Sequence, residues 1–144
     1  MARIKINYPA NIHFETLLKL RIYDMNYGGH LGNDSVLSII HEARVRFLLS
    51  LNLSEKNFYG NGLLMVDSAV LYKKQGFYGD TLNIKLSINE FSKYGFEITY
   101  IILDNLNNVE YARVKTGLVC YNYDLKKMCL IPEDFKFLFM NLKK

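Results

Sequence analysis

The sequence predicts an α+β fold in which one antiparallel sheet wraps around a single long helix. A strongly apolar helix is expected over Ser35–Leu51. Four strand-like segments follow it with short, turn-rich connections, which is the order expected of an antiparallel sheet. Because the helix is apolar on most sides, it must be buried against other elements on several sides. A single curved sheet that wraps around the helix can bury all of these sides.

Length and composition fit one globular domain spanning residues 1–144. Half of the residues are hydrophobic and 22% are charged, which excludes a disordered chain. The formal net charge is +4, with the basic residues interleaved among apolar ones along the whole chain. A nucleic-acid binder usually gathers its basic residues on one face, so we expect no nucleic-acid partner and favour small anionic ligands.

The elements before the sheet are a strand over Phe14–Tyr23, a loop over Asp24–Asp34 and the helix. The loop contains three glycines and is expected to need unusual backbone angles. Asn33, Asp34 or Ser35 can cap the first helical turn with a side-chain oxygen. One helix face carries Val36, Ile40, Ala43 and Phe47, widened by Leu37 and Leu48, and a polar strip carries Ser35, Ser38, Glu42 and Arg46.

Four long strands are expected after the helix, over Leu63–Gln75, Leu82–Phe91, Phe96–Leu103 and Val109–Tyr123. In the first of these, alternation places Leu64, Val66, Ser68, Val70 and Tyr72 on one face. The connection Asp104–Asn108 is an Asn-rich hairpin turn. Pro132 begins a short C-terminal helix, where its missing N–H costs little.

Two cysteines, Cys120 and Cys129, are too few for a disulfide framework and lack the spacing of a metal or redox motif. We therefore expect no metal site and a reducing compartment. The first residues contain no secretory signal, and no run approaches the length of a membrane span. The expected protein is soluble and cytoplasmic, with no membrane partner.

The loop and helix carry motifs that resemble the hotdog-fold thioesterases, in particular the 4-hydroxybenzoyl-CoA thioesterase-like family. Members of that family typically read Asp-x-Asp-x-x-Gly-His-Val-Asn-Asn before a helix that ends near Glu-x-x-Arg. The matching stretch here runs from Asp24 to Asn33, and the helix carries Glu42-Ala43-Arg44. Two further family features match Tyr78–Leu82 and Glu90–Phe96, so the resemblance covers roughly residues 18 to 123.

The resemblance implies an acyl-CoA thioesterase, which hydrolyses a thioester to a free acid and CoA. It implies an antiparallel sheet around one helix, and a homodimer or a dimer of dimers with sites at the subunit interface. The substrate would be an acyl-CoA or acyl-carrier thioester. Coenzyme A would be part of that substrate, so no separate cofactor is expected.

The resemblance assigns the oxyanion donor to the backbone N–H of Asn33, at the helix start. A helix N-terminus offers free N–H groups and a favourable dipole to developing negative charge. Gly28, Gly29 and Gly32 would let the backbone approach the thioester, or would simply shape the turn. His30 would polarise the carbonyl, orient a loop carboxylate or shuttle a proton, or would brace the loop.

Asn26 stands where the family has its catalytic carboxylate, and an amide cannot act as that base or nucleophile. Asn26 could orient water or the thioester oxygen, or could be a turn residue. Asp24, Glu42 and Asp67 are the candidate replacements, in that order of preference. Asp24 would share a side with Asn26 if the segment is extended; Glu42 could instead pair with Arg46, and Asp67 could be a hydrogen-bonded residue near a sheet edge.

The phosphate end of a CoA ester is expected to meet Lys73, Lys74, Ser92 and Lys93. Lys93 lies in the turn that matches the family's basic nucleotide-binding turn. A lysine suits an exposed phosphate because its ammonium is a compact point charge. Each lysine has an alternative role as a solvated surface residue.

The sequence is also compatible with two functions other than thioester hydrolysis. Hotdog-fold hydratases carry Asp-x-Asn-Pro-x-His before the helix, and Asp24, Asn26 and His30 match that pattern with one extra residue and no Pro. This leaves an enoyl-CoA hydratase-like enzyme as the second alternative. The amide at Asn26 supports a third, a non-catalytic acyl-thioester binding protein.

Overall fold

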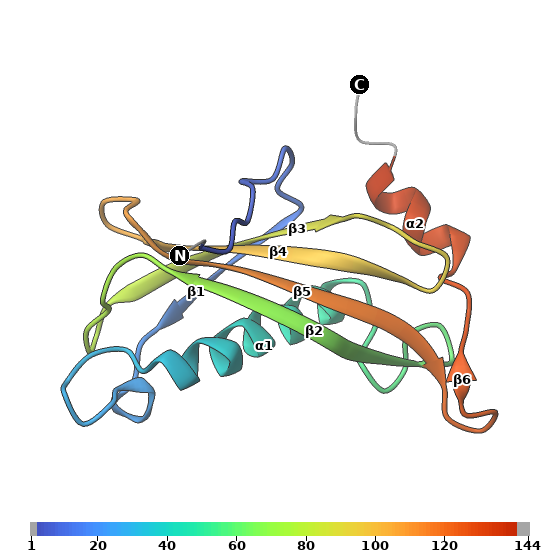
Figure 1. Ribbon diagram of the computed structural model, residues 1–144, viewed down its shortest axis with the longest axis horizontal. Coiled ribbons are helices and arrows are strands. Elements are labelled where there is room, and N and C mark those ends of the chain that lie inside the picture. The colour runs from blue at the N-terminus through green and yellow to red at the C-terminus, as the bar shows by residue number, and fades with distance from the viewer. Residues whose placement is uncertain (1–2, 141–144) are drawn as a thin grey trace.

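The computed structural model describes residues 3–140, which form one six-stranded antiparallel sheet with a long helix and a short one (Figure 1). The sheet has the order β1-β3-β4-β5-β2, and β6 pairs with β5. The elements are β1 (Phe14–Lys19), the 3₁₀ turn η1 (Ile22–Asp24), α1 (Asn33–Ser50), β2 (Gly62–Tyr72), β3 (Thr81–Asn89), β4 (Gly95–Asp104), β5 (Glu110–Asn122), β6 (Lys127–Met128) and α2 (Glu133–Met140).

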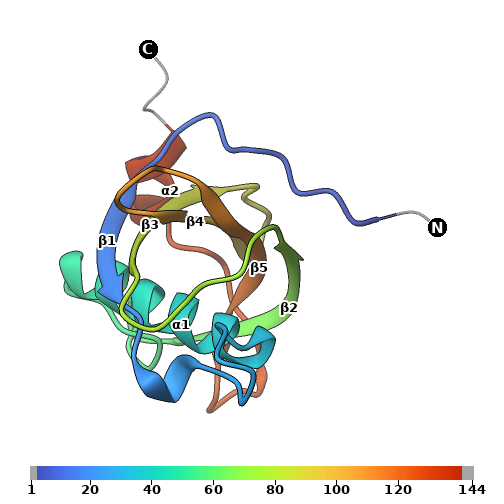
Figure 2. The same ribbon diagram turned by 90° about the vertical axis from the view of Figure 1, so that its left-hand side faces the viewer.

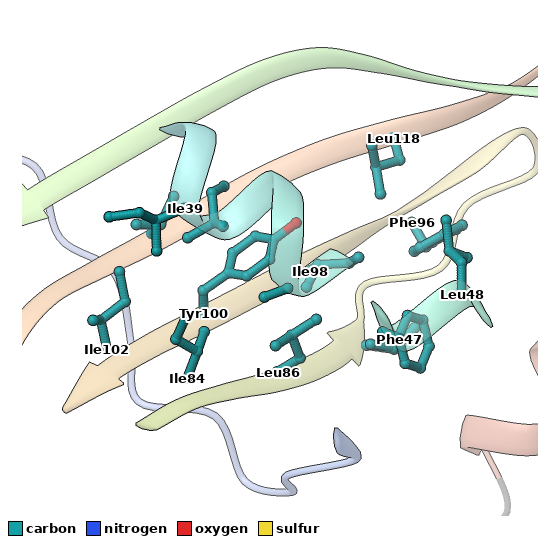
Figure 3. Packing of buried hydrophobic residues seen from close by; sticks show 14 of the residues in the cluster. Ile39, Phe47, Leu48, Ile84, Leu86, Phe96, Ile98, Tyr100, Ile102 and Leu118 are labelled. Atoms are coloured by element: carbon teal, nitrogen blue, oxygen red, sulfur yellow. The ribbon is translucent and has the colours of Figure 1, made fainter. Parts of the chain in front are cut away.

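The sheet curls around α1, as the view along the roll shows (Figure 2). Alternate residues of β3, β4 and β5 point inward and meet one face of the helix. Tyr100 lies at the centre of this core with its ring between the sheet and α1 (Figure 3). The core-facing residues include Val36, Ile40, Ala43 and Phe47 of α1 and Ile84, Leu86, Ile98, Ile102, Val114 and Leu118 of the sheet. The predicted architecture is therefore confirmed.

The helix is covered on fewer sides than its composition predicted. Leu37 was expected to widen the buried face, but it is exposed, as are Val45 and Leu49. These three residues lie along a stripe that no other part of the described chain covers. The expected side-chain cap is also wrong, because Gly32 is the N-cap residue and no side chain bonds to the first turn there.

Strand β2 occupies one edge of the sheet and contains a bulge between Met65 and Asp67. Leu64 pairs with Val119 and Ser68 pairs with Thr116, which are three residues apart on β5. Because successive strand residues alternate between faces, Leu64 and Ser68 point to opposite faces. The predicted single face for Leu64 through Tyr72 is therefore wrong, since the bulge inserts one extra residue.

Two smaller observations concern the two ends of the chain. The first strand ends at Lys19 rather than Tyr23, because η1 turns the chain toward the loop. The predicted C-terminal helix is confirmed as α2, whose Phe135 is fully buried. Its ring packs against Phe58 and Phe96 at centroid distances of 4.9 Å each, and so closes one end of the roll.

Candidate active site

Asn26 organises the loop that leads from η1 into α1. Its Oδ1 accepts hydrogen bonds from the N–H groups of Gly28 (2.9 Å) and His30 (3.2 Å). Its own N–H donates to the carbonyl of His30 at 2.7 Å. Gly29 has φ near +85°, a conformation that favours glycine. Asn26 therefore has the geometry of a turn residue, with its Oδ1 occupied by the backbone.

Gly32 brings the loop tightly against the start of α1. Its N–H donates to the carbonyl of Asp24 at 3.0 Å. A Cβ at this position would lie 2.6 Å from Oδ1 of Asp34, so a larger residue would displace the Asp34 carboxylate. The N–H of Asn33, the first helical residue, has no acceptor within the helix because the first-turn donors of any helix precede its ladder. That N–H can bind a developing oxyanion.

A cleft of about 230 Å³ opens beside this helix start. The strand β2 and the residues after it form its other wall, and the hydroxyl of Tyr72 donates to the carbonyl of Asn33 at 3.2 Å. No carboxylate lines this cleft in the described chain; its lining residues are Leu31, Asn33, Val36, Tyr72, Lys73, Lys74, Gln75, Tyr111 and Ala112. The cleft thus combines a helix N-terminus with two lysines.

The two lysines of the cleft also form ion pairs. Nζ of Lys73 lies 3.5 Å from Glu110, and Nζ of Lys74 lies 4.0 Å from Asp104. Burial raises the pKa of Glu110, but the hydrogen bond from Arg113 and the nearby cations outweigh it and leave the pKa below its ordinary value. Glu110 is therefore a charged partner for Lys73 at neutral pH.

His30 packs its ring edge-on against Phe77, with a centroid distance of 5.2 Å. Among the described residues, its Nδ1 is buried and has no hydrogen-bond partner. This leaves Nε2 as the ring nitrogen available to a bound molecule. His30 lies on the loop that runs into α1, next to Leu31 of the cleft wall, but is not itself one of the residues that line the cleft.

Asp24 is not available as a base beside Asn26, although Met25 between them is extended. Asp24 is the last residue of η1, and its carboxylate is buried. It accepts from the N–H of Arg21 at 2.8 Å and from that side chain at 3.2 and 3.3 Å. These contacts close the 3₁₀ turn, so the carboxylate is engaged away from the cleft.

Glu42 and Asp67 are also separated from the cleft. Glu42 is exposed and accepts a hydrogen bond from Nε of Arg46 at 2.9 Å, as the ion-pair alternative predicted. Asp67 pairs with Gly117 on the sheet face opposite the core. An added Cβ on Gly117 would collide with Oδ1 of Asp67, so that carboxylate lies over the outer face of the sheet.

Ser92 and Lys93 lie at the opposite end of the sheet from the loop (Figure 1). Ser92 holds the turn between β3 and β4, because its Oγ accepts from the N–H of Gly95 at 3.2 Å. Nζ of Lys93 lies 5.4 Å from the ring of Tyr94. A single chain therefore does not bring Lys93 to the cleft.

A buried ionic network, which the sequence did not predict, links α1 to the sheet. Arg44 donates to Oε2 of Glu55 at 2.7 Å and to the hydroxyl of Tyr100 at 3.0 Å. That hydroxyl lies 3.0 Å from Oγ1 of Thr116, and Oε1 of Glu55 lies 2.8 Å from Nε2 of His41. Its only sequence signal was the arginine of the Glu-Ala-Arg triplet, because Glu55 lies in a loop without periodic pattern.

The pKa values of the network follow from this pairing. Burial raises the pKa of Glu55, but hydrogen bonds from Arg44 and His41 outweigh it, so its pKa lies below the ordinary range. Burial likewise raises the pKa of Tyr100, which its contacts with Arg44 only partly offset. The network therefore holds an ionised carboxylate, a guanidinium and a neutral phenol.

Neither of the helices in residues 3–140 is long and apolar enough to cross a membrane. Within the same described range, no group of three or more His, Cys, Asp or Glu residues could hold a metal ion.

Comparison with known proteins gives one family match, to the thioesterase-like superfamily over residues 20–138. A 1,4-dihydroxy-2-naphthoyl-CoA thioesterase from Synechocystis superposes with a TM-score of 0.81 at 24% identity, covering 91% of this chain and 98% of that one. A thioesterase superfamily protein from Jannaschia sp. CCS1 gives 0.82 at 17% identity, covering 92% and 84%. A DHNA-CoA thioesterase from Staphylococcus aureus gives 0.74 at 20% identity, covering 86% and 84%. At these identities the likeness shows a shared fold.

Proposed function

The chain belongs to the thioesterase-like superfamily, and from that premise we propose that it is an acyl-CoA thioesterase. The observation that carries this proposal is the open N-terminus of α1, which faces a cleft lined by Lys73 and Lys74. Thioester hydrolysis generates an oxyanion, and a helix start stabilises one without a charged side chain. The fold shared with acyl-CoA thioesterases supports the same substrate class.

In the proposed reaction the thioester carbonyl oxygen accepts a hydrogen bond from the N–H of Asn33. His30 removes a proton from water through Nε2, and the resulting hydroxide attacks the carbonyl carbon. The tetrahedral intermediate then expels the thiolate, which takes up a proton. Water supplies the atoms of the new acid, so the reaction needs no cofactor beyond the CoA already in the substrate.

The test of this function is release of free thiol from a panel of aliphatic and aromatic acyl-CoAs, with acyl-carrier-protein thioesters as a second panel. We expect turnover of at least one substrate to acid and thiol. Loss of enoyl-CoA absorbance without free thiol would instead identify a hydratase. Tight binding of acyl-CoA without any product would identify a binding protein, which the absence of a carboxylate from the cleft also favours.

We also propose that the protein acts as a homodimer, alone or within a dimer of dimers, in the cytoplasm. Strand β2 is an eleven-residue edge strand, and its only strand partner in the described chain is β5. The exposed stripe of Leu37, Val45 and Leu49 lies on α1, the helix around which the sheet curls. Such an edge and stripe suit a second copy of the chain.

Antiparallel pairing of two β2 strands would reverse the second copy end for end. The loop end of one chain would then lie on the same side as the Lys93 end of its partner. This arrangement reconciles the wide separation of Lys93 from the cleft within one chain with a role for Lys93 in binding the nucleotide of CoA.

Sedimentation equilibrium at micromolar concentration should therefore give a dimer or tetramer. Val66→Lys places a charge on the exposed β2 edge and should shift the protein toward monomer with loss of activity. Leu106→Lys, in the exposed β4–β5 turn, is the matched control and should remain associated. A wild-type monomer with full activity would contradict the composite site.

Lys93→Ala should raise KM for CoA esters more than it lowers kcat, because binding of a distant phosphate is uniform between ground and transition states. The effect should shrink at high salt. Lys127→Ala, an exposed lysine of β6, is the control and should leave KM unchanged. An equal rise in KM for a pantetheine thioester, which lacks the nucleotide, would exclude phosphate binding by Lys93.

A further inference from the structure

The two cysteines lie opposite each other in the β5–β6 hairpin. Tyr121 pairs with Met128 and Asn122 pairs with Lys127, so the register continues to Cys120 and Cys129. The N–H of Cys129 donates to the carbonyl of Cys120 at 2.9 Å. The two Sγ atoms lie 3.2 Å apart, with the Cys129 thiol directed at that of Cys120. Both side chains are free thiols.

The surroundings of the two thiols differ. Cys120 points into the core and is fully buried, whereas Cys129 is partly exposed at the surface of the hairpin. Burial and the neighbouring sulfur raise the pKa of Cys120 above its ordinary value. A dissolved reagent can therefore reach Cys129, while Cys120 is shielded from it but remains beside Cys129.

The segment that follows Cys129 connects the hairpin to α2. Ile131 is buried, and its N–H donates to the carbonyl of Lys93 at 3.1 Å. α2 begins two residues later and inserts Phe135 into the end of the core. A covalent bond at Cys129 would therefore fasten the segment that positions α2.

We propose that Cys120 and Cys129 form a reversible dithiol–disulfide couple that responds to low-molecular-weight disulfides. The thiolate of Cys129 attacks one sulfur of oxidised glutathione, forming a mixed disulfide and releasing one reduced glutathione. Cys120 then attacks the sulfur of Cys129, loses its proton to solvent, and releases the second glutathione. Two protein thiols are oxidised to one disulfide as one glutathione disulfide is reduced to two thiols.

This chemistry requires little movement of the chain. The sulfurs need to approach from 3.2 Å to the length of an S–S bond, near 2.05 Å. The hairpin register already aligns the two residues, and the buried sulfur lies where it would resolve the mixed disulfide. The closed loop is short, so the disulfide should raise the melting temperature by only about 5 °C.

The test is incubation of the full-length protein with oxidised glutathione, followed by intact mass measurement and thiol counting after denaturation. The wild type should lose two hydrogens, retain no glutathione and melt about 5 °C higher, and dithiothreitol should reverse each change. Cys120→Ala should stop at a stable adduct of one glutathione on Cys129. Cys129→Ser should react at least about tenfold more slowly, because only the buried thiol remains.

Other outcomes would overturn the proposal. Retention of both thiols in the wild type, a persistent glutathione adduct, or cross-linked chains would each show that the two sulfurs do not form an internal couple. These wild-type readouts do not depend on whether either variant folds. They are also independent of thioesterase activity, so a failure here leaves the proposed function untouched.

Discussion

Glu55→Ala should lower the free energy of unfolding by about 3 kcal/mol, because it leaves the buried Arg44 guanidinium without its carboxylate. The Arg44 side chain is only 6% exposed, and its remaining protein partner is the hydroxyl of Tyr100. For a domain of this size, the loss corresponds to a melting temperature about 10 °C lower. Urea unfolding at a fixed protein concentration measures the change while holding any self-association constant.

Two further variants separate the contribution of the Arg44–Glu55 pair from that of its neighbours. Arg44→Met combined with Glu55→Ala should be more stable than Glu55→Ala alone, because it also removes the unpaired cation. His41→Ala should cost less than about 1 kcal/mol, since the His41 side chain is half exposed. Equal stability of the wild type and Glu55→Ala would show that Arg44 is satisfied by water or by a partner chain.

The same network predicts a pH dependence. The pKa of Glu55 is lower in the folded chain than in the unfolded one. Its stabilising contribution is therefore fully present above the unfolded value, near 4.5, and is lost as the pH falls through the folded pKa. Glu55→Gln should remove this part of the acid dependence, which unfolding measured between about pH 6 and pH 3 would show as a flatter profile.

Local patterns predicted most of the fold because they depend on neighbours along the chain. The inward face of α1 follows from a helical period, and all of Val36, Ile40, Ala43 and Phe47 are buried. The exposed Leu37 could not be predicted in the same way. Hydrophobicity indicates that such a residue is suited to burial, but not whether its cover comes from the same chain or from another one.

The β2 bulge and the Arg44–Glu55 ionic network are two further features that the sequence pattern could not predict. Alternation alone cannot reveal an extra residue, so one bulge after Met65 inverted every later prediction about the faces of β2. The link between Arg44 and Glu55 joins a helix to a loop across the fold. Neither spacing nor propensity encodes such a contact, and it became visible only with the tertiary structure.

In the candidate site, too, the sequence predicted the local features but not those that depend on the tertiary structure. The motif located the loop and the helix start correctly, because the turn depends on Asn26, Gly29 and Gly32 themselves. The position of a replacement base depends on the directions of side chains, which the sequence does not determine. Asp24 was expected beside Asn26, yet a short 3₁₀ turn directs its carboxylate to Arg21 instead.

His30→Gln should lower kcat by about 10²-fold or more if His30, on the loop next to the cleft, is the general base. The glutamine keeps a polar side chain of similar length but cannot accept the proton. KM should change little, because His30 acts on water and not on the distant parts of the substrate. Glu42→Gln and Asp67→Asn are the matched controls and should retain near wild-type kcat, since neither carboxylate faces the cleft.

Asn26→Asp tests the loop by adding a candidate base, whereas His30→Gln removes one. The new carboxylate can accept the same hydrogen bonds from Gly28 and His30, so the turn should survive. Its second oxygen would stand where the amide nitrogen is now, and would place a carboxylate where the family motif has Asp. Hydrolysis should then equal or exceed wild type above about pH 6, where a carboxylate is ionised.

Variants at Asn26 and His30, measured singly and together, distinguish a catalytic loop from one that has only a structural role. In the Asn26→Asp background, loss of His30 should cost less than it does in wild type, because the carboxylate can replace the missing base. Asn26→Ala should slow the reaction, because the N–H groups of Gly28 and His30 lose their acceptor and the loop loosens beside Asn33. If folded Asn26→Ala and His30→Gln both hydrolyse acyl-CoAs at the wild-type rate, the loop is purely structural and the base lies elsewhere.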